Sequence, residues 1–202
     1  MAMSRAETRV LADRLIAGES WRADAVRIAC ANILMILCAQ IVLPLPWTPV
    51  PVTGQTFGVL LIAVLLGSRR GALVMGLYLL EGLAGLPVFA PVGMPGAARF
   101  IGPTAGYLLS YPLAAFVTGW LVERPHAIVN KRVARAIHLL SALLAGEFAM
   151  FTVGCAWLAA ITHNGWLWAL AAGAAPFVPG ELLKLAAVFT AVRGVEIASR
   201  KS

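Results

Sequence analysis

Long, nearly uncharged apolar segments fill most of this sequence and constrain its fold more than any other feature. The runs lie at about 25–43, 55–68, 70–86, 104–122, 136–162 and 179–195. A bilayer core needs about 20 apolar residues per helical span, and each span must satisfy its own backbone hydrogen bonds. The sequence therefore predicts an all-α integral membrane protein with six transmembrane helices.

The composition agrees with a lipid environment. Of the 202 residues, 60% are hydrophobic and 12% charged, and the mean hydropathy is +0.85; a soluble domain has about 25% charged residues. We expect one membrane domain at 25–195, a cytoplasmic N-terminal segment at 1–24 and a cytoplasmic tail at 196–202. The first segment mixes arginines with acids and has no small-residue cleavage signal after its apolar run, which argues against a cleaved signal peptide.

The basic residues predict the orientation, because Lys and Arg near span ends are retained in the cytoplasm. Fourteen of the 16 lie before or at the start of the first helix, between the second and third, between the fourth and fifth, or after the sixth. Both termini are therefore predicted to be cytoplasmic, with three connections outside. Only Arg99 and Lys184 remain on the outer side.

Proline shows the opposite asymmetry, since ten of the 12 prolines fall in the three outer connections. Proline fixes φ and removes a backbone donor, so these connections are expected to be stiff. Stiff outer loops suit a preformed pocket, although prolines that merely end helices explain the same pattern.

Several function classes lack support in the sequence. The net charge of +7 forms no aromatic-interleaved patch, which argues for topology rather than nucleic-acid binding. The three histidines and three cysteines have no metal-ligand spacing, and neither a phosphate-binding loop nor a G-x-S-x-G motif is present. We expect no enzyme activity, resident metal or cofactor, and transport would need an ion gradient or a partner ATPase.

The strongest candidate site is Pro176–Lys184, where a helix begins at about Pro179 and carries Glu181 and Lys184 three residues apart, on one face. Ionisable groups at membrane depth are normally paired or functional. The helix N-terminus and Lys184 together favour an anion, and Glu181 suits a ligand with N–H donors. The alternative is an ion pair that only neutralises itself.

Arg99 can supply a second donor to a ligand carboxylate, or can extend to a lipid phosphate instead. Thr53 and Gln55 place a hydroxyl and an amide where the second helix begins, although Thr53 also fits a helix cap. Four aromatic residues are candidates for an apolar wall or, individually, for ordinary core positions. They are Tyr78, Phe89, Tyr107 and Phe177.

Four ordered motifs carry a family resemblance: Val50-Pro-Val-Thr-Gly-Gln-Thr56, Gly85-Leu-Pro-Val-Phe-Ala90, Gly102-Pro-Thr-Ala-Gly-Tyr107 and Pro176–Lys184. Together they resemble the BioY family, the biotin-binding S components of energy-coupling-factor (ECF) transporters. The resemblance implies outward capture of biotin, with its ureido group on Glu181 and its carboxylate on Lys184. Family members usually carry Asp at the acidic position, so Glu181 adds one methylene.

The same resemblance implies partners. These are a transmembrane coupling subunit, which would meet a small-residue face of the first helix at Ala25 and Ala29, and a pair of ABC-type ATPases. The alternative is a stand-alone carrier of biotin or a similar carboxylate, in which Glu81 or Glu147 takes a coupling proton.

Overall fold

The computed structural model describes residue 11 and residues 20–124 and 131–198 of the chain. Most of the predicted N-terminal segment, and the last residues of the predicted tail, lie outside the described residues. The elements, in chain order, are α2 (Trp21–Gln40), β1 (Val42–Leu43), β2 (Val52–Thr53), α3 (Gln55–Leu83), η1 (Gly96–Ile101), α4 (Ala105–Val122), α5 (Lys131–Thr162), α6 (Gly165–Gly173), η2 (Ala175–Phe177) and α7 (Val178–Ala198). Five stretches of this part of the chain are long and apolar enough to cross a membrane. The prediction of a multi-span helical membrane protein is confirmed.

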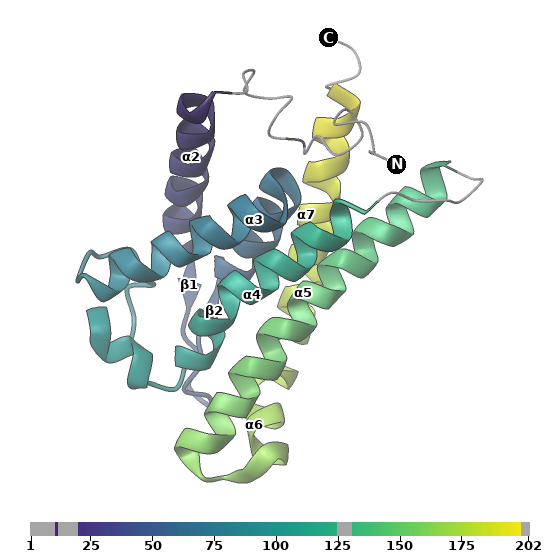
Figure 1. Cartoon of the computed structure of the whole chain (residues 1–202). Coiled ribbons are helices and arrows are strands. Elements are labelled where there is room, and N and C mark those ends of the chain that lie inside the picture. The colour runs from purple at the N-terminus through teal and green to yellow at the C-terminus, as the bar shows by residue number, and fades with distance from the viewer. Residues whose placement is uncertain (1–10, 12–19, 125–130, 199–202) are drawn as a thin grey trace.

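α3 contains the sharp turn that the sequence predicted between its second and third helices. Gly67 has φ 79° and ψ −176°, a conformation open only to glycine, and it divides α3 into helices at 55–66 and 68–83. The two halves fold back on each other and pack closely: a Cβ placed on Gly71 would lie only 3.2 Å from the Cα of Ala63. With the halves counted separately, each of the six predicted helices has a counterpart (Figure 1).

The end of α4 closes this turn. Glu123 accepts hydrogen bonds from the Ser68 backbone N–H (2.9 Å) and from the Ser68 hydroxyl (2.7 Å). A carboxylate at this position satisfies a free donor at the N-terminus of the second half and complements its dipole. Gly119 allows the approach, since a Cβ there would lie 2.3 Å from Ser68 N.

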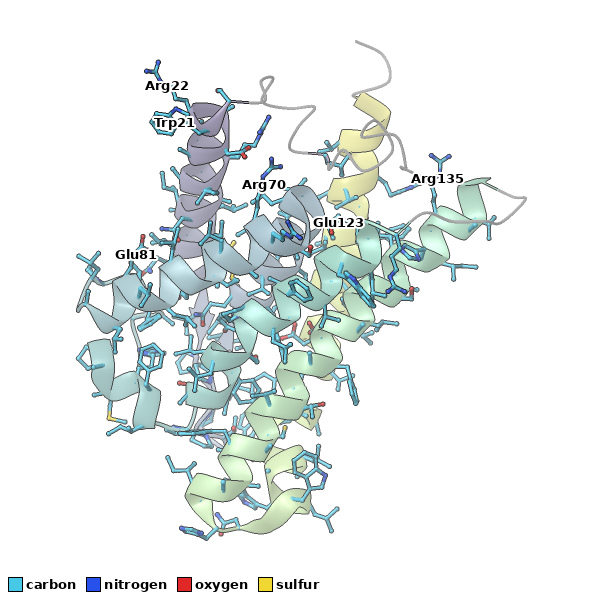
Figure 2. The ribbon with its side chains drawn as sticks, viewed as in Figure 1. Trp21, Arg22, Arg70, Glu81, Glu123 and Arg135 are labelled. Atoms are coloured by element: carbon cyan, nitrogen blue, oxygen red, sulfur yellow. The ribbon has the colours of Figure 1, made fainter. Side chains whose placement is uncertain are left out.

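Basic residues gather at the same end of the molecule. Figure 2 shows Arg22, Arg70 and Arg135 toward this end, near the start of α2, the turn in α3 and the start of α5, respectively. Asp24 forms ion pairs with Arg27 (2.5 Å) and with Arg70 (2.9 Å), which tie α2 to α3. The basic end predicted from the sequence is therefore a structural feature of the described residues.

The three proline-rich or glycine-rich connections build the opposite end. Their short strands and helices were not predicted. β1 and β2 pair antiparallel, with Val42 opposite Thr53, around the first proline-rich loop. α6 occupies Gly165–Gly173, where only a connection was expected. The segment is almost wholly apolar, and the positive φ angles of His163 and Gly165 turn the chain back after α5.

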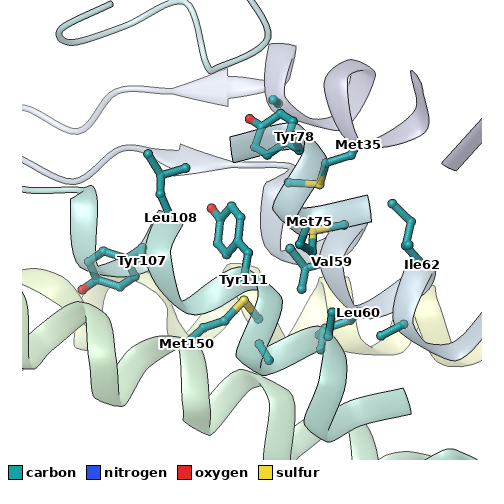
Figure 3. Close-up of a cluster of buried hydrophobic side chains, with 14 of the residues drawn as sticks. Met35, Val59, Leu60, Ile62, Met75, Tyr78, Tyr107, Leu108, Tyr111 and Met150 are labelled. Atoms are coloured by element: carbon teal, nitrogen blue, oxygen red, sulfur yellow. The ribbon is translucent and has the colours of Figure 1, made fainter. Parts of the chain in front are cut away.

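The core lies where α3, α4 and α5 pack together, with α2 against α3 (Figure 1). Its largest fully buried side chains include Tyr78, Met75, Met35 and Met150, which come from α3, α2 and α5 (Figure 3). Each of these helices also exposes large hydrophobic residues, as lipid-facing surfaces do. This packing holds the beginnings of α3, α4 and α7 beside one another.

Candidate functional site

A small cavity lies between β2 and the beginnings of α3, α4 and α7. Its volume is about 40 Å³. The lining residues are Val50, Pro51, Thr53, Gln55, Thr56, Arg99, Thr104, Tyr107, Leu108, Tyr111, Phe151, Gly173, Phe177, Glu181 and Lys184. Seven of the nine residues predicted to bind a ligand are among them, and Tyr78 and Phe89 are not.

The polar centre of the cavity is a closed group of three side chains. The ammonium of Lys184 donates to Glu181 Oε1 (2.7 Å) and to Thr56 Oγ1 (2.9 Å). The Thr56 hydroxyl in turn donates to Glu181 Oε2 (2.7 Å). Glu181 is 7% exposed, so this group is held away from bulk water. A hydrogen-bonded pair of opposite charges offers a ligand both an acceptor and a donor at one place.

The first turn of α7 positions Glu181 and Lys184, as their spacing predicted. Pro176 and Pro179 stand before and within this turn, where a missing N–H costs no intrahelical bond. Thr56 was not predicted as a site residue. Its place in the first turn of α3, next to Gln55, was the available signal.

Gln55 and Thr53 have structural partners as well as a place on the cavity wall. Gln55 Nε2 donates to the Tyr78 hydroxyl (2.8 Å), and both side chains are buried. Thr53 Oγ1 accepts from the Gln55 backbone N–H (3.3 Å), but the N-cap residue of α3 is Gly54, so Thr53 is not the helix cap weighed from the sequence. Tyr78 packs edge-on against Phe89 at 5.3 Å. Tyr78 and Phe89 thus support Gln55 from behind rather than line the cavity.

Arg99, in η1, is buried and bound to the loop that precedes it. Its Nε donates to Met94 O (2.9 Å), and its Nη2 donates to Ala90 O (2.8 Å) and to Val92 O. The side chain is 6% exposed and lies over the Phe89 ring, so it does not extend to lipid phosphate. Burial lowers the pKa of the Arg99 guanidinium, which nevertheless stays protonated in proteins.

The Arg99 charge has no acidic partner within the described residues, and Nη1 makes no hydrogen bond to them. Because Arg99 lines the cavity, its Nη1 is a cationic donor at the site whose charge is balanced by no acidic side chain in the part of the chain that the structure describes. Such a donor favours a ligand carboxylate.

An aromatic wall completes the cavity. The Tyr107 hydroxyl donates to Gly173 O (2.7 Å), which joins α4 to the end of α6. Phe151 packs edge-on against Tyr107 at 5.9 Å and lies 6.3 Å from Phe177. Tyr107 and Phe177 were predicted. Phe151 and Tyr111 were missed, because nothing in an apolar helix marks which aromatic residues face inward.

Comparison with known proteins agrees with this geometry, because residues 11–201 match the BioY family. The chain belongs to the BioY family. It is 37% identical to "Biotin transporter BioY" of Rhizobium etli over 154 residues, which cover 74% of this chain and 79% of that protein. The corresponding Rhodobacter capsulatus protein is 37% identical over 171 residues, which cover 76% and 87%, respectively. The Thermotoga maritima protein is 39% identical over 152 residues, which cover 75% and 83%.

A solved structure shows the same fold. It is the crystal structure of an S-component for biotin from an ECF-type ABC transporter, with a TM-score of 0.74. The match covers 89% of this chain and 95% of that one at 24% sequence identity. The arrangement of helices described above is therefore the S-component arrangement.

Two further features of this BioY-family chain lie outside the cavity. Ala25 and Ala29 are both exposed on α2, a helix that packs mainly on α3. Glu147 is 8% exposed, and neither of its oxygens has a hydrogen-bond partner among the described residues. Glu147 and Glu181 line a neighbouring apolar groove between α5 and α7.

Proposed function

We propose that this chain captures biotin and serves as the substrate-specific subunit of an ATP-driven ECF importer in a prokaryotic cytoplasmic membrane. The observation that carries the proposal is the buried Glu181–Lys184–Thr56 group beside the unmatched charge of Arg99. Family membership supports it, since several relatives bear the name biotin transporter. No resident cofactor enters the proposal, because biotin is the transported ligand.

The chemistry of biotin matches two separate parts of the site. Its ureido group presents two N–H donors and one carbonyl acceptor, which Glu181 and Lys184 can meet together. Its bicyclic ring is mainly apolar and suits the wall of Tyr107 and Phe177. Glu181 is one methylene longer than the Asp usual in the family, and its contact with Thr56 gives this longer side chain a fixed position.

Two cations compete for the biotin carboxylate. The sequence favoured Lys184, whose charge is already paired with Glu181 in the structure. Arg99 has no acidic partner in the described part of the chain and retains an unused amino group. The geometry therefore favours Arg99 as the carboxylate partner and leaves Lys184 for the ureido carbonyl.

Biotin binding requires this cavity to widen. Ligand sites have volumes of about 300 Å³ or more, whereas the cavity has about 40 Å³. Arg99 and Thr104 stand in the wall that faces a larger neighbouring cavity, so a small movement of these side chains would enlarge the inner cavity. Biotin is thus expected to displace side chains of this wall as it enters.

Transport needs partners, because the sequence has no phosphate-binding loop. We propose a transmembrane coupling subunit that packs on the exposed small residues Ala25 and Ala29 of α2, and a pair of ABC-type ATPases. The basic end that carries Arg70 and Arg135 would face the cytoplasm, with both termini on that side.

The direct test is biotin binding to the purified chain in nanodiscs, measured by isothermal titration calorimetry. We expect one biotin per chain, and much weaker binding after Glu181→Leu, which removes the ureido acceptor. A folded wild-type protein that takes up no biotin would overturn the proposal. Circular dichroism and size-exclusion chromatography report whether the protein is folded.

A stand-alone carrier is the second candidate, and the unpartnered carboxylate of Glu147 is the observation that favours it. Vesicles that contain this chain alone separate the two. Uptake that follows a proton gradient and ignores ATP supports the carrier, whereas uptake that appears only with the coupling subunit and ATPases supports the importer.

A further inference from the structure

A second, larger cavity adjoins the first on the side of the loops. Its volume is about 310 Å³. The residues that line it are Pro44, Leu45, Thr48, Pro49, Pro51, Val92, Gly93, Met94, Arg99, Gly102, Pro103 and Thr104. Three of them, Pro51, Arg99 and Thr104, also line the inner cavity, so the two spaces share one wall.

The outer cavity opens to the surface and is stiffly built. Pro44, Pro49, Gly93 and Met94 are all exposed, which places its mouth at the surface of the molecule. Four of its lining residues are prolines, whose fixed φ angles limit loop movement.

Hydrogen bonds hold the loops of this cavity in place. The Thr48 hydroxyl donates to Ala172 O (2.6 Å), which ties the first loop to the end of α6. Trp157 Nε1 donates to Gly102 O (2.9 Å), and Arg99 binds the carbonyls of the second loop. A cavity fixed in this way at three connections is preformed rather than a gap between mobile loops.

The shared wall carries the donors that a ligand would meet on passing outward. Arg99 Nη1 makes no hydrogen bond within the described residues, and neither does the Thr104 hydroxyl. An amide carbonyl at this position can accept from either group, as a carboxylate can. No acidic side chain lines the outer cavity among the described residues, so nothing there repels an anionic substituent.

We propose that the outer cavity holds a substituent joined through an amide to the ligand's carboxyl carbon, so that this chain also takes up amide conjugates of biotin. A volume of about 310 Å³ is at the lower limit of ordinary ligand pockets and accommodates a group of the size of a lysine side chain. The inference rests on the proposed function, because it assumes that the bicyclic ring lies in the inner cavity. The ligand class is neutral biotin amides with one amino-acid-sized substituent.

The test fills the outer cavity without touching the inner one. Met94 is suited to this, because its side chain lines only the outer cavity and is 42% exposed, while its contact with Arg99 is made by the backbone. Met94→Trp adds bulk to the cavity, and Met94→Leu is the matched control. The ligands are biotin and biocytin, in which biotin is amide-linked to the lysine ε-nitrogen.

We expect wild-type protein to bind both ligands in calorimetric titrations. Met94→Trp should lower the affinity for biocytin by about ten-fold or more, because the larger side chain overpacks the outer cavity. It should leave the affinity for biotin nearly unchanged, and Met94→Leu should change neither affinity. Val92→Trp enters the same cavity from another position and serves if Met94→Trp does not fold. Wild-type protein that binds biotin but excludes biocytin would overturn this inference alone, as would equal losses for both ligands. Failure to bind biotin at all would overturn the proposed function as well.

Discussion

The assignment of the biotin carboxylate to Arg99 can be tested by removing the charge from the protein and from the ligand in turn. Arg99→Gln removes the cation, and biotin amide replaces the ligand's carboxylate by a neutral group. A hydrogen bond between charged groups contributes about 1.5–3 kcal/mol, or roughly 10- to 150-fold in affinity. Wild-type protein should therefore prefer biotin to its amide by a factor in this range, and Arg99→Gln should lose most of that preference.

The ratio of the two affinities is the informative quantity, because Arg99 also holds the loop carbonyls of Ala90, Val92 and Met94. Loosening this loop lowers the affinities for both ligands and leaves their ratio unchanged. Loss of the charge pair lowers only the affinity for biotin and therefore changes the ratio. Lys184→Gln is the matched control, and we expect it to weaken both ligands while preserving the preference. Titration calorimetry in nanodiscs measures all six affinities. A preference that persists in Arg99→Gln and disappears in Lys184→Gln would refute the reasoning and return the carboxylate to Lys184.

Three further predictions concern single contacts. Thr56→Val should weaken biotin binding by about ten-fold, because a lost buried hydrogen bond costs roughly 1–2 kcal/mol. Thr56→Ser keeps the hydroxyl and should not weaken binding. Equal biotin affinity in both variants would remove Thr56 from the site. Gly67→Ala should lower the free energy of unfolding by about 1–3 kcal/mol, because only glycine adopts the backbone conformation of residue 67 without strain. Gly76→Ala is the control: a Cβ at Gly76 would meet no atom within 4 Å, so this substitution should be neutral or stabilising. Thermal unfolding monitored by tryptophan fluorescence would compare the two, and equal melting temperatures would contradict the account of the turn. Glu147→Gln should leave ATP-driven biotin uptake by the complete importer intact, since Glu147 does not line the inner cavity and Gln keeps its size. Loss of uptake with retained binding would favour a proton-coupled step.

The helices of this chain could be predicted because lipid leaves little choice in secondary structure. Apolar length alone located α2, α4, α5 and α7, and Arg69 and Arg70 indicated the turn that falls at Gly67. α6 was missed because the same cue fails for short elements. Its nine residues are too few to span the membrane, and its apolar composition is that of any buried or interfacial segment.

Charged residues located the site more accurately than aromatic ones, for a physical reason. A cation at membrane depth or in a buried loop has a high desolvation cost, so it needs partners or a ligand, and few places in the fold provide them. The two cations that the orientation rule left over, Arg99 and Lys184, both line the inner cavity. An aromatic ring has no comparable cost in any apolar surrounding. Tyr107 and Phe177 accordingly line the cavity while Tyr78 and Phe89 pack behind it, and only tertiary packing separates the two pairs.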